Sequence, residues 1–187
     1  MARFRWPMSP YQAILGDALA TLHPNVRRAH EAPLTAEGTF DVVHGTQRIT
    51  PILVALMKLP AAGSRVPVAL SMTVDPVRTN GGPPTLRWER RIGQTPLSTH
   101  QHAHRGFLVE EHGQGRIVFS LRAANGCLLY EHASTRFLFL RLPHALSPRI
   151  RALVSPELDG WHVDVRVDWH GHLVCAYGGR MRPLQAA

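Results

Sequence analysis

The chain has 187 residues, 44% hydrophobic and 18% charged, which fits one folded domain over residues 1–187 with a core from about Pro10 to Pro183. This composition excludes a disordered chain. The net charge is +8, but 20 of the 21 basic residues are arginines scattered along the sequence rather than clustered with exposed aromatics, which argues against a nucleic-acid partner.

The expected helices come early in the chain. Ser9 suits an N-cap and Pro10 a first helical position, and apolar residues then recur at helical spacing up to the stop at His23-Pro24. A second helical turn is expected over residues 25–30. A short, strongly apolar helix should begin at Thr50-Pro51 and end near residue 60.

From Val66 onward the apolar period changes to two, which predicts strands. Turns are expected at residues 80–82, Asn125-Gly126 and His170-Gly171. The proline-containing connection over residues 143–160, with a short helix at 149–154, is expected to form a lid or mouth. The predicted fold class is therefore α+β: a curved antiparallel β-meander of about eight strands, a half-barrel or open barrel, covered by the N-terminal helices.

The apolar stretches and the cysteines indicate where in the cell the protein is expected. The longest apolar stretch, residues 52–57, is far too short to cross a bilayer, and residues 1–8 lack the apolar core of a secretory signal. Cys127 and Cys175 are too few for a disulfide framework. We therefore expect a cytoplasmic protein without a transmembrane segment.

Several short motifs carry a family resemblance. They are Tyr11-Gln12-Ala13-Ile14-Leu15-Gly16, Arg87-Trp88 with Arg91, Leu108-Val109-Glu110, Leu142-Pro143 with Leu146-Ser147-Pro148, and Gly160-Trp161-His162-Val163-Asp164-Val165 with Tyr177 and Gly179.

Together these motifs resemble a bacterial domain-of-unknown-function family that occurs alone or C-terminal to saccharopine-dehydrogenase-like nucleotide-binding domains. The resemblance implies a fold but no reaction. The chain lacks a glycine-rich phosphate-binding fingerprint, so no dinucleotide site is inferred. The histidines of residues 99–104 depart from the more arginine-like family pattern, so an activity built on them would be peculiar to this member.

Those histidines form the first candidate site. His100, His102 and His104 alternate along one expected strand, so their imidazoles would share a face and could bind a transition metal, with Glu89, Glu110 or Glu131 completing the shell. The alternative is a solvated face in a histidine-rich chain. The cofactor is otherwise unknown.

The second candidate is acid-base catalysis by residues that strand pairing would bring into one cavity: Glu110, Tyr130, Glu131 and His132. A carboxyl group between apolar walls has a raised pKa and can transfer protons near neutrality. The alternative is that the glutamates only pair with Arg90, Arg105 or Arg136 across strands.

The third candidate is an apolar pocket between the helices and the concave face of the sheet. Its expected lining is aromatic and sulfur-containing: Met57, Met72, Trp88, Phe107, Phe119, Phe137, Phe139, Trp161 and Trp169. Core packing accounts for the same residues without a ligand.

The leading interpretation is a small-molecule binding module for a lipid- or polyketide-like ligand, serving a biosynthetic or redox partner enzyme. Two other classes stay open. One is an enzyme, a cyclase, isomerase or dehydratase using Glu110, or a metal enzyme using the histidines. The other is a structural interaction domain that pairs through an exposed edge and through residues 137–142, of which residues 137–140 are apolar on both faces.

Overall fold

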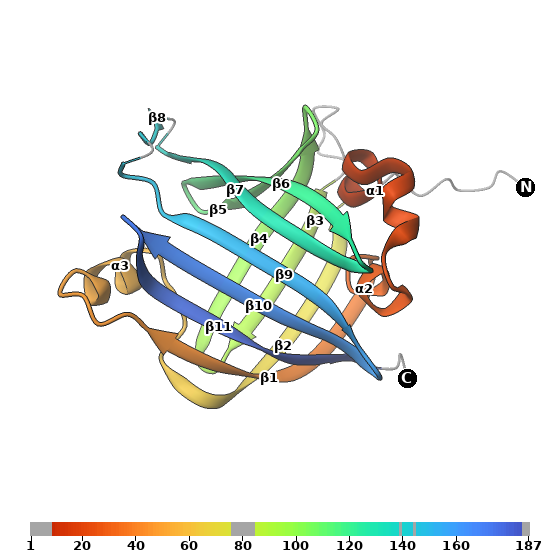
Figure 1. Ribbon diagram of the computed structural model, residues 1–187, viewed down its shortest axis with the longest axis horizontal. Helices are drawn as coiled ribbons and strands as arrows, with labels where there is room; N and C mark the ends of the chain where they lie inside the picture. The colour runs from red at the N-terminus through yellow and green to blue at the C-terminus, as the bar shows by residue number, and fades with distance from the viewer. Residues whose placement is uncertain (1–8, 76–84, 139, 144, 185–187) are drawn as a thin grey trace, which may run out of the picture.

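The computed structural model describes residues 9–75, 85–138, 140–143 and 145–184 (Figure 1). Strands hold 62% of these residues and helices 15%. The elements are, in chain order, α1 (Pro10–Leu15), the 3-10 helix η1 (Gly16–Thr21), α2 (Pro24–Arg28), β1 (Leu34–His44), α3 (Thr50–Leu56), β2 (Gly63–Asp75), β3 (Thr85–Ile92), β4 (Thr95–His104), β5 (Phe107–His112), β6 (Gly115–Ala124), β7 (Cys127–Phe137), β8 (Leu140–Arg141), β9 (Arg149–Glu157), β10 (Gly160–Trp169) and β11 (His172–Pro183).

Ten of these strands close into an antiparallel barrel. Their order is β6-β5-β4-β3-β2-β1-β11-β10-β9-β7, and pairing of β6 with β7 completes the ring. The two-residue strand β8 pairs only with the end of β7. Since β1 pairs with β11, Ala36 lies opposite Pro183, and the first and last strands of the chain are neighbours in the wall.

Glycines permit the close contact between β1 and β11. A Cβ atom at Gly38 would lie 2.0 Å from the carbonyl oxygen of Arg180, and one at Gly179 would lie 2.1 Å from the carbonyl oxygen of Thr39. No side chain fits at such distances, so glycine is required at both positions. Glycines inside strands allow the sharp bending that a closed barrel needs.

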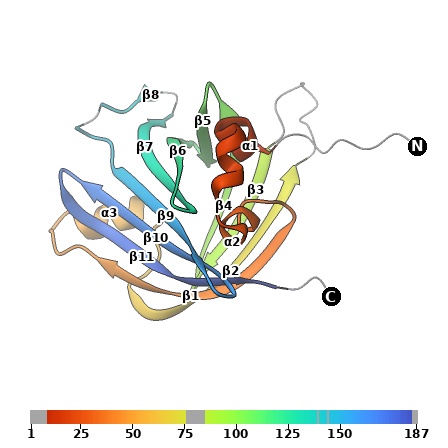
Figure 2. The same ribbon diagram turned by 45° about the vertical axis from the view of Figure 1, so that its right-hand side comes forward.

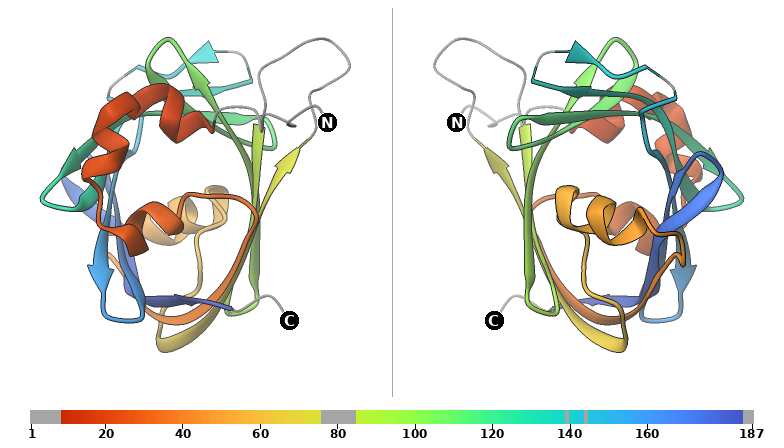
Figure 3. Two further views of the ribbon diagram at one scale, coloured as in Figure 1. Left: turned by 90° about the vertical axis from the view of Figure 1, so that its right-hand side faces the viewer. Right: turned by 90° about the vertical axis from the view of Figure 1, so that its left-hand side faces the viewer.

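The helices lie at the two ends of the barrel (Figures 2 and 3). At one end lie α1, η1 and α2, which insert Tyr11, Leu22 and Val26 into the core. As predicted, Ser9 caps α1 by accepting a hydrogen bond from the Gln12 amide at 3.1 Å. At the opposite end lies α3, which connects β1 to β2 and packs Leu53 against the core.

The predicted fold class, an open or half-closed α+β meander of about eight strands covered by helices, is therefore wrong. The protein is mostly β, and its sheet is closed. The predicted helix at residues 149–154 and the long lid are also wrong, because β9 occupies Arg149–Glu157 between β10 and β7. The turns at Asn125-Gly126 and His170-Gly171 are confirmed; the one predicted at residues 80–82 lies outside the described residues.

Candidate ligand-binding site inside the barrel

A chain of hydrogen bonds crosses the interior near the α1 end. The Tyr130 hydroxyl donates to the Tyr11 hydroxyl at 3.2 Å, and Tyr11 donates to Gln101 Oε1 at 2.6 Å. Gln101 Nε2 donates to Glu110 Oε2 at 3.2 Å, and the other oxygen of Glu110 accepts from Arg90 Nη2. The chain joins one helix to four strands of the wall.

Strand alternation explains why these polar residues lie inside. Arg90 shares its face of β3 with the buried Trp88 and Ile92, and on the neighbouring strands it lies opposite Leu70 of β2 and Leu97 of β4. By the same alternation, Gln101 lies directly opposite Glu110 on β5. The interior is otherwise apolar, so a polar cluster there is a local exception rather than the general character of the lumen.

Arg90 and Glu110 form an ion pair within the barrel. Burial alone would raise the pKa of the Glu110 carboxyl. The attraction of Arg90 and hydrogen bonds from Arg90, Thr99 and Gln101 outweigh burial, so the pKa of Glu110 lies below its usual value. Arg90 Nη2 also donates to Thr99 Oγ1 at 2.7 Å. The carboxylate is therefore ionised at neutral pH and its charge is balanced.

Aromatic rings surround this cluster. The His30 ring lies 4.7 Å from that of Tyr11, 6.2 Å from that of Trp88 and 6.1 Å from that of Tyr130, measured between centroids. Burial lowers the pKa of His30 to about 4, although a hydrogen bond to the Val26 carbonyl opposes the shift. His30 is therefore neutral under ordinary conditions.

The tyrosines of the cluster are also neutral. Burial raises the pKa values of Tyr11 and Tyr130 far above their usual range, and it raises the pKa of Tyr177 to about 12. Tyr177 lies on β11 and interacts electrostatically with Arg90 and Glu110 across the interior. The lumen thus presents neutral hydroxyl groups beside one balanced ion pair.

Two buried donors of the cluster have no hydrogen-bond partner: Trp88 Nε1 and Arg90 Nε. The guanidinium carbon of Arg90 lies 5.6 Å from the centroid of the Trp88 ring, so both donors belong to one small region. Buried N–H groups are nearly always paired in folded proteins, so two unpaired donors in one small region are unusual.

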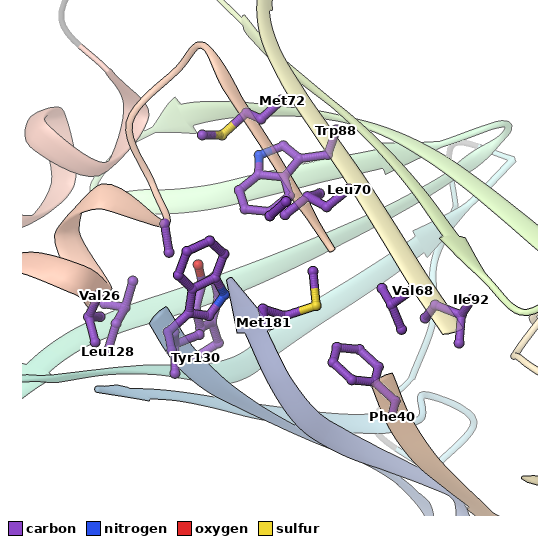
Figure 4. Close-up of a cluster of buried hydrophobic side chains, with 14 of the residues drawn as sticks. Val26, Phe40, Val68, Leu70, Met72, Trp88, Ile92, Leu128, Tyr130 and Met181 are labelled. Carbon is purple, nitrogen blue, oxygen red and sulfur yellow. The ribbon is translucent and has the colours of Figure 1, made fainter. Parts of the chain in front are cut away.

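The cluster also has free surface beside it. The Arg90 side chain keeps 22% of its surface accessible and the Glu110 side chain 13%, although both point inward. A water-sized molecule can therefore contact part of both side chains, although it does not reach Trp88 Nε1 or Arg90 Nε themselves. Figure 4 shows the side chains of Met72, Trp88, Tyr130 and Met181 in the interior, where they come from different strands and are all buried. A ten-stranded barrel is wider than the eight-stranded barrels whose side chains alone fill the lumen.

The structure brings together two of the four predicted catalytic residues. Glu110 and Tyr130 join the internal network. Glu131 is exposed on the other face of β7. His132 is half-buried, and its Nε2 lies 2.8 Å from Thr135 Oγ1 and 3.5 Å from Ser147 Oγ, in a separate cluster toward the end of the barrel where α3 lies.

Of the predicted pocket residues, Met72, Trp88, Phe119 and Trp161 are buried in the interior, and Met57 and Trp169 are partly buried against it. Phe107 and Phe137 are 40% and 46% exposed. Phe139 lies outside the described residues.

The predicted metal ligands share one face, as the alternation indicated, but it is the outer face. His100 lies opposite Glu111, His102 opposite Val109 and His104 opposite Phe107, while Gln101 between them points inward. His100 Nε2 lies 3.2 Å from an Asp75 carboxylate oxygen. Within residues 9–75, 85–138, 140–143 and 145–184, no group of three or more His, Cys, Asp or Glu side chains is arranged to hold a metal ion. A metal at these histidines stays a prediction.

Sequence reasoning missed Tyr11, His30, Arg90 and Gln101 as site residues. For two of them a signal existed: Arg90 lies in phase with Leu86, Trp88 and Ile92, and a charged residue in the apolar phase of a strand marks a buried polar site. Gln101 likewise lies in the opposite phase to its neighbouring histidines. Tyr11 and His30 carried no such signal, because they lie on α1 and in the turn after α2, and the sequence does not specify how these segments dock on the barrel.

Outside the barrel, a hollow of about 480 Å³ lies over β4 to β8. Its walls include Phe107 and Val118 and four arginines: Arg105, Arg116, Arg136 and Arg141. None of the described helices has the length and apolarity needed to span a bilayer.

Comparison with known proteins places the chain in a family. No curated protein and no solved structure matches the chain. The family described as Domain of unknown function (DUF4166) matches residues 22–181, which include ten of the eleven strands in full and most of β11. The chain belongs to this family.

Proposed function

We propose that the protein binds an apolar small molecule inside the barrel and recognises an uncharged carbonyl oxygen on it. The observation that carries this proposal is the pair of unpaired buried donors, Trp88 Nε1 and Arg90 Nε, beside accessible surface in an otherwise apolar lumen. An apolar cavity with a few convergent polar groups is the usual form of a small-molecule site.

The charge balance favours a neutral acceptor over a carboxylate. Arg90 is already paired with Glu110, so a second anion would compete with Glu110 and leave a buried negative charge uncompensated. A ketone, ester or amide oxygen accepts the two free N–H groups without disturbing the ion pair. Lipid- and polyketide-like molecules carry such groups on apolar frames.

The ion pair itself supports a role in binding. A buried ion pair generally stabilises a fold no more than well-packed apolar residues would, so its presence in a barrel core indicates a use other than stability. The low pKa of Glu110 favours a positioning role for this residue over that of a general acid. Catalysis by Glu110 and Tyr130 stays a hypothesis, and turnover retained by Glu110→Gln would refute it.

The test uses three fluorescent probes: the aromatic ketone propionyl-dimethylaminonaphthalene, the hydrocarbon diphenylhexatriene and the anion anilinonaphthalene sulfonate. We expect the ketone to bind more tightly than the anion. Trp88→Phe and Arg90→Met should each weaken ketone binding by about tenfold, the value of one hydrogen bond to a buried group, and leave hydrocarbon binding nearly unchanged.

Arg91→Met is the matched control, because Arg91 is the exposed neighbour of Arg90 on the outer face of β3. It should leave the affinity for all three probes unchanged. If no probe binds, or if Arg90→Met and Arg91→Met affect ketone binding equally, the proposed site is wrong. Native mass spectrometry of the purified protein would in addition report the mass of any molecule retained from the expression host.

A further inference from the structure

Exposed apolar side chains gather at the end of the barrel where α3 lies. Among the described residues, eleven large hydrophobic side chains are exposed, and eight of them lie at this end. They come from the end of β1, from α3 and the residue before it, and from the segment around β8: Val43, Ile49, Ile52, Leu56, Phe137, Leu138, Leu140 and Leu146. Figures 1 and 3 show α3 and β8 at the same end, opposite α1 and α2.

Several of these eight side chains expose most of their surface to solvent. Ile52 is 62% exposed and Leu56 is 72% exposed on α3, while Leu53 and Met57 of the same segment pack against the core. Leu140 is 72% exposed. These exposed apolar side chains form two groups at one end of the barrel, one on and around α3 and one around β8, rather than being scattered over the whole surface, and such grouping indicates an interaction surface.

The two stretches of sequence that contain α3 and β8 carry only positive charge. No Asp or Glu occurs within residues 42–74 or within residues 132–156, the two stretches that contain α3 and β8. Basic residues do occur there, and those next to the exposed apolar side chains are Arg48, Lys58, Arg136 and Arg141. Three acidic residues on neighbouring strands also lie toward this end, and each has partners: Asp41 accepts from Ser64 and Arg65, Glu111 pairs with Arg116, and Asp168 pairs with Arg166.

We infer that this end docks on an anionic lipid bilayer. The docking surface consists of Ile52, Leu56, Leu140 and Leu146 with Arg48, Lys58, Arg136 and Arg141. Apolar side chains inserted at the headgroup boundary, ringed by cations that contact lipid phosphates, are the chemistry by which peripheral proteins hold an anionic membrane.

The composition of the docking surface argues against two other binding partners, a second copy of the chain and a nucleic acid. A second copy of the chain would bring its own Arg48, Lys58, Arg136 and Arg141 close to those of the first copy, and like charges at a contact are repulsive. A single-stranded nucleic acid would call for exposed aromatic rings on which bases stack, whereas this surface is mostly leucine and isoleucine. The proposal does not depend on the proposed function, although docking would bring the α3 mouth of the barrel next to the lipid.

The experiment is sedimentation of the full chain with vesicles of phosphatidylcholine alone and of phosphatidylcholine mixed with phosphatidylglycerol. The protein should partition onto the anionic vesicles and much less onto the neutral ones, and added salt should weaken the binding. Ile52→Asp/Leu56→Asp, and separately Arg136→Glu/Arg141→Glu, should each lower partitioning onto anionic vesicles by at least about tenfold.

Matched controls lie at the opposite end. Leu158 is 93% exposed in the β9–β10 turn, so Leu158→Asp tests whether any exposed leucine has the same effect. Arg28→Glu/Arg122→Glu makes the same change in net charge at the α2 end. Both controls should bind like the wild type. Circular dichroism and thermal unfolding report whether each variant is folded.

Three results would overturn the proposal. The first is equal partitioning onto neutral and anionic vesicles, or none onto either. The second is equal loss of binding in the control and docking-surface variants, which would show a general charge effect. The third is a dimer in light scattering that Ile52→Asp/Leu56→Asp converts to monomers, which would show that a second copy covers the surface.

Discussion

The hydroxyl groups of Tyr130 and Tyr11 lie 3.2 Å apart, and their hydrogen bond joins the helix α1 to the wall strand β7 across 119 residues of sequence. Tyr11 is also the donor to Gln101. It is therefore the link through which the N-terminal helix is connected to the Arg90–Glu110 pair.

This link predicts unequal costs for removing the two hydroxyl groups. Tyr11→Phe leaves both the Tyr130 hydroxyl and Gln101 Oε1 unpaired in the core, so it should lower the free energy of unfolding by about 2 kcal/mol. Tyr130→Phe removes one donor from a hydroxyl that keeps its bond to Gln101, so it should cost about 1 kcal/mol. Urea titrations followed by tryptophan fluorescence measure both values. Equal losses would contradict the proposed order of the network.

The Arg90–Glu110 pair predicts strong coupling between two variants. Arg90→Met alone leaves a buried carboxylate without its cation and should destabilise the protein by about 3 kcal/mol; Glu110→Leu should cost a similar amount. The double variant should be more stable than the sum of the two losses predicts. Arg87→Met, which breaks an exposed pair with Glu89, should cost under about 1 kcal/mol. Additive losses at Arg90 and Glu110 would show that the pair does not act as a unit.

His30 predicts a loss of stability in mild acid. Its pKa is about 4 in the folded protein and 6.5 when unfolded, so between these values the unfolded chain binds a proton that the folded protein does not. The contribution of neutral His30 to the free energy of unfolding should therefore be fully present above pH 6.5. The free energy of unfolding should fall by as much as about 3 kcal/mol as the pH drops to 4. His30→Gln keeps a donor for the Val26 carbonyl and should flatten this part of the curve. An unchanged slope in the variant would assign the acid sensitivity to other groups.

Glycine at the β1–β11 contact predicts a large cost for one added methyl group. Gly38→Ala would place a Cβ 2.0 Å from a backbone oxygen, so β1 and β11 must separate and the loss should exceed about 3 kcal/mol. At Gly115 the nearest atom to an added Cβ is 3.3 Å away, so Gly115→Ala is the matched control and should cost about 1 kcal/mol or less. Thermal unfolding compares the two. Similar melting temperatures would mean that β1 and β11 can separate at little cost in stability.

Local patterns in the sequence predicted local structure well. Asn125 and Gly126 have φ values of 51° and 76°, which a tight hairpin turn requires and which asparagine and glycine tolerate. The prediction failed at β9, where the prolines of residues 143–160 favoured a long connection with a short helix over a strand. Pro156 lies beyond the part of β9 that pairs with β7, which ends at Val154, so its missing N–H interrupts no hydrogen bond on that side.

Closure of the sheet and the position of the site depend on distant pairings. Period-two alternation shows that Arg90 and Glu110 lie on the apolar faces of their strands, but it does not show which strands are neighbours. From the sequence, Arg90 is one of three arginines with which Glu110 could pair, beside Arg105 and Arg136. The pair lies inside only because β6 meets β7 and β1 meets β11, which no short motif encodes.

The β1–β11 pairing has a consequence during protein synthesis. The partner of β1 is the final strand of the barrel, so β1 leaves the ribosome long before Arg180 and Met181 exist to pair with it. Until then β1 has one free edge, and its unpaired N–H and C=O groups are open to other chains. Formation of such distant pairs is slow. The nascent chain should therefore depend on a chaperone, or on β1 staying unpaired until β11 has been made. This dependence should be stronger than for a barrel whose first and last strands are not neighbours.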